Sequence, residues 1–147
     1  MLSKLEGYDY VIIDCPPAVG AILQSILVAS DEVIIPVTAD RYSLQGLSQI
    51  WETIQNIRQG MNTGLRITGF LLVKYNTRTN LNKDIYTALE EIAEDLDTKI
   101  FETYIRESTK AREALAARQT LISYAPKATT AEDYVAFVEE FLNRTKR

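Results

Sequence analysis

The residues with the most specific chemistry lie near the N-terminus, in the stretch YDYVIIDCPP that covers Tyr8–Pro17. An apolar, β-branched run ends there at Asp14, and Pro16 and Pro17 follow. A carboxylate at the end of a buried strand can hold Mg²⁺, usually through a water, because this ion prefers oxygen ligands and keeps much of its hydration. The alternative is an aspartate that caps the next turn, which is common where strands end. The prolines force an extended exit from the strand and favour the first interpretation.

Composition excludes several other kinds of chemistry. The chain has no histidine, which excludes His-based acid–base catalysis and argues against a dedicated zinc site. Its single cysteine, Cys15, excludes an internal disulfide framework and fits a reducing cytoplasm. The net charge of −4 argues against a general binder of polyanions but leaves a local basic patch open. No apolar run approaches the roughly 18 to 20 residues of a membrane helix, and we expect a cytoplasmic protein that does not bind membranes.

Short apolar runs alternate with amphipathic segments along the chain. The apolar runs predict strands over Tyr10–Cys15, Glu32–Val37, Ile67–Val73 and Lys99–Ile105, with a short last strand over Leu121–Pro126. Helical spacing predicts helices over Ala18–Ala29, Ser43–Met61, Leu81–Leu96, Thr109–Ala117 and Thr130–Asn143. This alternation predicts an α/β fold with three layers, in which helices flank a mostly parallel sheet, and a single domain over residues 1–147.

Several details of these helices also follow from the residues. Ala18–Ala29 is apolar almost all round and is predicted to be largely buried. Ser43 is a candidate N-cap, and Thr129 with Glu132 has the pattern of a capping box. In the last helix, four apolar residues are predicted to face the core, namely Phe137, Val138, Phe141 and Leu142. Ligands of open parallel sheets bind at the carboxyl ends of strands, which here are Asp14–Pro17, Val37–Tyr42, Lys74–Arg78 and Ile105–Lys110.

The sequence resembles one protein family along nearly all of its length. YDYVIIDCPPAVG is similar to the Walker B segment of the ParA/Soj-type chromosome and plasmid partition ATPases, relatives of MinD with a P-loop NTPase fold. The segments ASDEVIIPVTADRYSLQGLSQIWETI and GFLLVKYNTRTNL resemble the family's next strands, loops and long helix. KIFETYIRESTKAREALAARQTLISYAPKATTAEDYVAFVEEFL resembles its C-terminal third. These matches are collinear, which makes the resemblance strong.

The resemblance implies roles for individual residues. Asp14 corresponds to the Walker B aspartate, which positions Mg²⁺ through a water when nucleotide is bound, and Pro16 and Pro17 shape the loop under the phosphates. The segments Lys74–Asn76 and Ile105–Glu107 correspond to loops that enclose the adenine base. They make Asn76 and Arg106 candidate nucleotide-binding residues, although Asn76 is equally well explained as a turn residue after a strand. Many family members have Ile-Pro where this chain has Ile105 and Arg106, so its adenine pocket differs in detail.

The family's phosphate-binding motif is absent from the printed sequence. The family uses a KGGxGK[ST] loop, whose backbone amides and lysines hold the phosphates. The glycines here stand at positions 7, 20, 46, 60, 64 and 69, and none is followed by lysine. We therefore interpret the chain as the C-terminal part of a ParA-like ATPase domain. ATP and Mg²⁺ are the family's cofactors, and we expect the 147 residues alone to bind ATP weakly or not at all and to hydrolyse it negligibly.

Binding partners are also implied by the resemblance. Arg78 and Lys110 fall where the family carries DNA-contacting basic residues, and Arg112 lies near Lys110; the alternative is a solvated surface of mixed charge. The family further implies non-specific DNA, a ParB-like partner protein and association with the nucleoid. We expect self-association or a dimer, since unpaired sheet edges tend to pair. The main functional alternative is a catalytically inactive module that dimerises with an intact ParA-type ATPase and modulates it.

Overall fold

The computed structural model describes residues 6–16, 20–38, 40–76 and 80–145. The chain divides into two compact units, which are described separately below. The first unit consists of Met1–Val33 and Gly46–Arg66, and the second consists of Ile34–Gln45 and Ile67–Arg147. The single domain over residues 1–147 stays a prediction.

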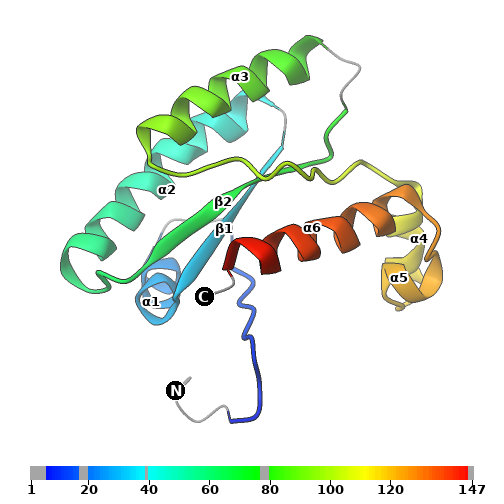
Figure 1. The fold of residues 1–147 in the computed structure, drawn as a ribbon, viewed down its shortest axis with the longest axis horizontal. Helices are drawn as coiled ribbons and strands as arrows, with labels where there is room; N and C mark the ends of the chain where they lie inside the picture. The colour runs from blue at the N-terminus through cyan, green and yellow to red at the C-terminus, as the bar shows by residue number, and fades with distance from the viewer. Residues whose placement is uncertain (1–5, 17–19, 39, 77–79, 146–147) are drawn as a thin grey trace. The chain divides into compact units, whose positions relative to one another are not determined.

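Helices and strands alternate from α1 to α3, and three more helices follow (Figure 1). Their order is α1 (Ala21–Ala29), β1 (Glu32–Thr38), α2 (Arg41–Gly60), β2 (Arg66–Val73), α3 (Asn80–Asp95), α4 (Thr109–Ala116), α5 (Leu121–Tyr124) and α6 (Thr129–Thr145). The strands β1 and β2 are neighbours in a sheet and run in the same direction. The predicted α/β fold with a parallel sheet is confirmed, and both strands lie within one residue of their predicted bounds.

The sheet continues beyond β2 in an irregular form. Parallel bridges join Phe70 to Ile100 and Val73 to Ile105. The predicted strand Lys99–Ile105 therefore pairs with β2 at two points, without becoming a regular strand. Glycine at position 69 allows β2 and the segment that begins at Lys99 to approach closely. A Cβ at this residue would lie 2.8 Å from the carbonyl oxygen of Lys99.

The core of the second unit forms between this ladder and α6. Leu71, Phe101 and Ile105 are buried, and Phe137 and Phe141 of α6 pack against them. The rings of Phe101 and Phe137 meet edge to face, with centroids 5.0 Å apart. These contacts confirm the predicted core-facing side of the last helix at its two phenylalanines; Val138, by contrast, is about half exposed at 48%.

In the first unit, one asparagine closes the end of α1. The Nδ2 group of Asn62 donates to the carbonyl oxygens of Leu27 at 3.0 Å, Val28 at 3.2 Å and Ser30 at 2.7 Å. The last carbonyls of a helix have no partner within the helix, so a side-chain donor from elsewhere stabilises its end. Asn62 thus ties α1 to the turn that follows α2.

Two predictions about the N-terminal region are wrong. Residues 10–15 form no strand, and the side chains of this apolar run are exposed, with Ile12 94% exposed. A strand exists only where a neighbour pairs with it, and the local preference of YVIID for extended backbone cannot supply that neighbour. The helix α1 is also not largely buried: Leu27 is its buried residue, whereas Ile22 is 65% exposed.

Three local predictions, one of a strand and two of helix caps, are wrong. Leu121–Pro126 is not a strand; Leu121–Tyr124 form the short helix α5, because the Thr120 hydroxyl accepts from the Ser123 amide at 3.2 Å and caps a helical turn. Ser43 is not an N-cap, since α2 begins at Arg41. Thr129 lies inside α6, whose first amides donate to the carbonyl oxygen of Ala128.

Candidate functional site

The carboxyl ends of β2 and of the 100–105 segment meet at one edge of the second unit. The Ile105 amide donates to the Leu72 carbonyl at 2.8 Å, and the Tyr75 amide donates to the Ile105 carbonyl at 3.1 Å. This parallel ladder places the predicted base-binding segments Lys74–Asn76 and Ile105–Glu107 next to each other. Lys74 adopts a left-handed conformation with φ of 52°, which turns the chain as it leaves the strand.

Two tyrosines line this edge. The rings of Tyr75 and Tyr104 meet edge to face with centroids 5.1 Å apart. Burial, and secondarily the neighbouring Tyr104, raises the pKa of Tyr75, so its phenol stays protonated at neutral pH. Asn76 is exposed beside this pair and makes contacts within the chain. The sequence reasoning missed both tyrosines, although each flanks the end of a predicted strand.

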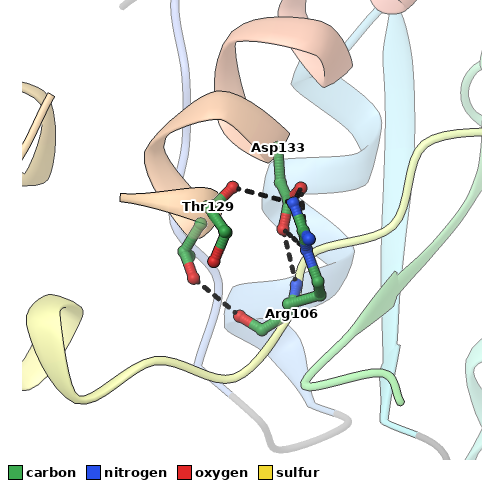
Figure 2. A network of polar contacts seen from close by, with 4 residues as sticks. Arg106, Thr129 and Asp133 are labelled. Atoms are coloured by element: carbon green, nitrogen blue, oxygen red, sulfur yellow. Dashed lines mark hydrogen bonds and ion pairs between the residues drawn. The ribbon is translucent and has the colours of Figure 1, made fainter. Parts of the chain in front are cut away.

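Arg106 is held by an acidic residue of α6 (Figure 2). Its guanidinium binds both carboxylate oxygens of Asp133, with Nη2–Oδ1 at 2.6 Å and Nε–Oδ2 at 2.9 Å. Its backbone amide donates to Oδ2 at 3.0 Å, and its Nη2 also donates to the Thr129 carbonyl at 3.2 Å. The Thr130 hydroxyl completes the network by donating to the Arg106 carbonyl at 3.1 Å.

The electrostatics of this pair favour its charged form. Burial by itself raises the pKa of Asp133, but the hydrogen bonds and charge of Arg106 outweigh burial and hold the pKa below its ordinary value. The Asp133 side chain is 10% exposed and that of Arg106 is 42% exposed. Arg106 thus has a defined structural partner, and only the exposed part of its side chain is open to a ligand. Sequence reasoning missed Asp133, whose only signal was an acidic residue in the first turns of a helix.

Two of the three candidate DNA-binding residues, Lys110 and Arg112, lie on α4. The Ser108 hydroxyl caps this helix by accepting from the Lys110 amide at 3.1 Å. Lys110 Nζ pairs with Glu113 Oε2 at 2.8 Å, and this hydrogen bond and charge raise the pKa of the lysine. Arg112 is exposed. Arg78 lies outside the described residues, so the predicted patch of Arg78 with Lys110 stays a prediction.

Asp14, the candidate magnesium residue, belongs to the first unit. It lies with Pro16 on an exposed segment without regular secondary structure, while Pro17 lies outside the described residues. Burial and the charge of Asp14 raise the pKa of the neighbouring Cys15 thiol. Across the described ranges, histidine, cysteine, aspartate and glutamate side chains form no group of three or more that could hold a metal ion. Asp14 supplies a single carboxylate, which by itself is too few ligands for Mg²⁺.

Comparison with known proteins gives matches along most of the chain. A family profile described as an AAA domain matches residues 2–67. The sporulation initiation inhibitor protein Soj of Bacillus subtilis is 37% identical over 92% of this chain and 52% of its own length. The chromosome partitioning protein ParA of Myxococcus xanthus is 34% identical over 93% of this chain and 47% of its own length. The chain therefore spans about half the length of these curated relatives.

Solved structures agree on the fold. A crystal structure of cobyrinic acid a,c-diamide synthase from Mycobacterium smegmatis, with bound ADP and magnesium, superposes with a TM-score of 0.64. It is 31% identical, and the match covers 80% of this chain and 47% of that protein. Among the helices that the structure describes, none is both long and apolar enough to cross a membrane.

Proposed function

The chain belongs to the ParA/Soj-type family of partition ATPases, and from this premise we propose that it acts in the segregation of a plasmid, a chromosome or a mobile element. The observation that carries the proposal is the match to a Soj and a ParA over more than nine-tenths of the chain. The ladder that brings Lys74–Asn76 beside Ile105–Glu107 supports it, because it builds the strand-end edge where nucleotides bind in this class of fold.

The cofactors in this proposal are ATP and Mg²⁺, and the chain fits them in part. Tyr104 and Asn76 offer an aromatic ring and an amide suited to a base, and the exposed side of Arg106 is nearby in sequence. Tyr75 is buried and packs edge to face against Tyr104. Asp14 offers one carboxylate toward a magnesium ion, which when bound would neutralise phosphate charge. The phosphates themselves have no matching loop in the printed sequence. The residues present thus fit the base and not the triphosphate.

We further propose that these 147 residues correspond to the C-terminal part of a partition ATPase domain and by themselves hydrolyse ATP negligibly. Hydrolysis then requires a phosphate-binding loop from outside the printed sequence. Asp14 alone would repel an uncomplexed triphosphate.

One observation favours a second function, that of an inactive module which dimerises with an intact ATPase of the same family. The run Val11–Ile13 is exposed, as is Ile22 of α1, and exposed apolar surface of this kind commonly marks a protein interface. Co-purification with a full-length ATPase that hydrolyses ATP at a changed rate would support this alternative. A ParB-like partner protein that stimulates such an ATPase belongs to the first proposal.

DNA binding can be tested with the 147-residue chain by itself. The candidate contacts are Lys110 and Arg112 on α4, together with Arg78. Fluorescence anisotropy with a random duplex should show weak binding that falls about 40-fold between about 50 and 200 mM salt, as three phosphate contacts would give.

The variants Lys110→Ala and Arg112→Ala should each weaken this binding and reduce its salt dependence by about one phosphate contact. Lys127→Ala is the matched control, because Lys127 is an exposed lysine outside the candidate set. Equal loss in all three variants would mean that any surface cation contributes and that α4 carries no DNA site.

A further inference from the structure

The segment formed by residues 100–106 has two backbone edges with different partners. On one edge, the amides of Phe101 and Ile105 donate to the carbonyls of Phe70 and Leu72 in β2, at 2.9 and 2.8 Å. In a wider sheet, the opposite edge would pair with a further strand. Here the backbone groups of that outer edge are bound by side chains of the helix α6.

Glu140 and Arg144 bind the beginning of the outer edge. The two carboxylate oxygens of Glu140 accept from the successive amides of Glu102 and Thr103, each at 2.8 Å. Arg144 Nη2 donates to the Ile100 carbonyl at 2.8 Å and to Glu140 at 2.5 Å. Hydrogen bonds that involve an ionised group are stronger than neutral ones, so these contacts compete well with a strand.

Thr130 and Asp133 bind the end of the same edge. The Asp133 carboxylate accepts from the Arg106 amide at 3.0 Å, and the Thr130 hydroxyl donates to the Arg106 carbonyl at 3.1 Å. The contacts therefore begin in the first turn of α6 and end in its last, and they reach both ends of the segment.

Apolar packing holds α6 where these polar side chains can act. Phe137 lies between the two polar groups along the helix, and Phe141 lies between Glu140 and Arg144. Both rings pack on the buried cluster that contains Phe101. The Arg144 guanidinium stacks over the Phe101 ring, 4.2 Å from its centroid. The helix α6 and the segment 100–106 are thus joined both by apolar packing and by hydrogen bonds from side chains to the backbone.

We propose that Thr130, Asp133, Glu140 and Arg144 form an edge cap, which prevents a second copy of this chain from adding a strand along residues 100–106. Unpaired edges recruit strands from other molecules, and a helix that covers an edge is one known means of preventing this. Any self-association of the chain then uses other surfaces. The edge cap affects assembly of the chain and does not depend on nucleotide or DNA binding.

Amide hydrogen exchange tests the edge cap directly, in the whole chain. In the wild-type protein, the Glu102 and Thr103 amides should be protected at every protein concentration. Glu140→Ala removes their acceptor, so both amides should exchange at least about tenfold faster in dilute solution. At high concentration they should regain protection, while sedimentation velocity shows a larger dimer fraction than the wild type. Glu139→Ala, an exposed neighbour on the same helix, should behave as the wild type.

Any one of three results would overturn the proposal. The first is rapid exchange of these two amides in the wild-type protein, which needs no variant. The second is a folded Glu140→Ala chain with exposed amides but an unchanged dimer fraction. If that variant does not fold, Glu140→Gln keeps one acceptor oxygen; one amide of the pair should then exchange faster while circular dichroism stays unchanged. The third result is continued protection of both amides in Glu140→Gln.

Discussion

Asp133 connects two parts of the second unit through a single carboxylate. It accepts hydrogen bonds from both the side chain and the backbone of Arg106, which lies 27 residues earlier in the chain. The carboxylate is nearly buried while the guanidinium is partly exposed. Loss of the carboxylate would therefore leave a backbone amide and a cation short of partners, and that loss matters more than the surface ion pair itself.

Substitution Asp133→Asn should destabilise the chain by about 1–2 kcal/mol, because a neutral amide oxygen replaces a charged acceptor in a mostly buried position. Urea denaturation followed by circular dichroism measures this change. Glu132→Gln is the matched control, because Glu132 is the exposed neighbour of Asp133 on α6. An effect of equal size in both variants would contradict a specific role for the pair.

Gly69 is the second residue with a sharp structural requirement. An added Cβ would lie 2.8 Å from the Lys99 carbonyl oxygen and 2.9 Å from Cε2 of Phe101. Gly69→Ala should therefore cost about 1–3 kcal/mol of unfolding free energy, as overpacking does in cores. Gly64→Ala is the control, since the nearest atom to its added Cβ is 3.8 Å away. If Gly69→Ala were as stable as the control, β2 and the segment that begins at Lys99 could move apart without cost, and the close contact at Gly69 would not be required.

The element whose contacts depend most on charge is α6. Burial raises the pKa of Glu140, but hydrogen bonds from the Thr103 and Glu102 backbone and the charge of Arg144 outweigh burial and lower it. Asp133 has a lowered pKa for similar reasons. A carboxylate whose pKa is lower in the folded state than in the unfolded state stabilises the fold above its unfolded pKa.

The stability of the chain should therefore fall on acidification. The contribution of these two carboxylates is fully present above about pH 5 and is lost as pH falls through their lowered pKa values. Urea midpoints measured from neutral to acidic pH give the curve. The double variant Asp133→Asn, Glu140→Gln should be less stable at neutral pH and show a flatter curve. The same slope in both proteins would show that other carboxylates control acid unfolding.

Elements that depend on local pattern could be predicted from the sequence. Continuous apolar runs located β1 and β2 to within a residue, and the Ser108-capped helix α4 lies where its alanine-rich pattern predicted. The run Tyr10–Cys15 has the same pattern, but pairing depends on a neighbouring strand and cannot be read from the run itself. The strand predicted over Leu121–Pro126 is wrong because a hydroxyl cap favours a helical turn over a short strand there.

The candidate site could be predicted only in part. Its two loops follow strand ends, and parallel strand ends share an edge, so their proximity followed from the order of elements. The partners of those loops could not be predicted in the same way. Asp133 and Glu140 reach their targets across 27 to 38 residues of chain, and no spacing rule connects such positions.

At the scale of the whole molecule, the residues proposed to bind nucleotide are divided between two compact units, each described by itself. Asp14 belongs to the first unit, whereas Lys74–Asn76 and Ile105–Glu107 belong to the second. The printed sequence contains candidate base-binding segments and one candidate magnesium carboxylate, and it contains no KGGxGK[ST] phosphate loop. Phosphate contacts supply much of the affinity for a nucleotide. We therefore expect these residues alone to bind ATP weakly or not at all.

Calorimetric titration of the 147-residue chain with Mg-ATP tests this account most directly. We predict no saturable heat, which corresponds to a dissociation constant weaker than about 1 mM. Adenosine provides a useful comparison, because it lacks the phosphates and should bind no more weakly than Mg-ATP if only the base-binding edge is present. A dissociation constant for Mg-ATP of about 1 μM would contradict the account, because it would require a phosphate-binding site within these residues.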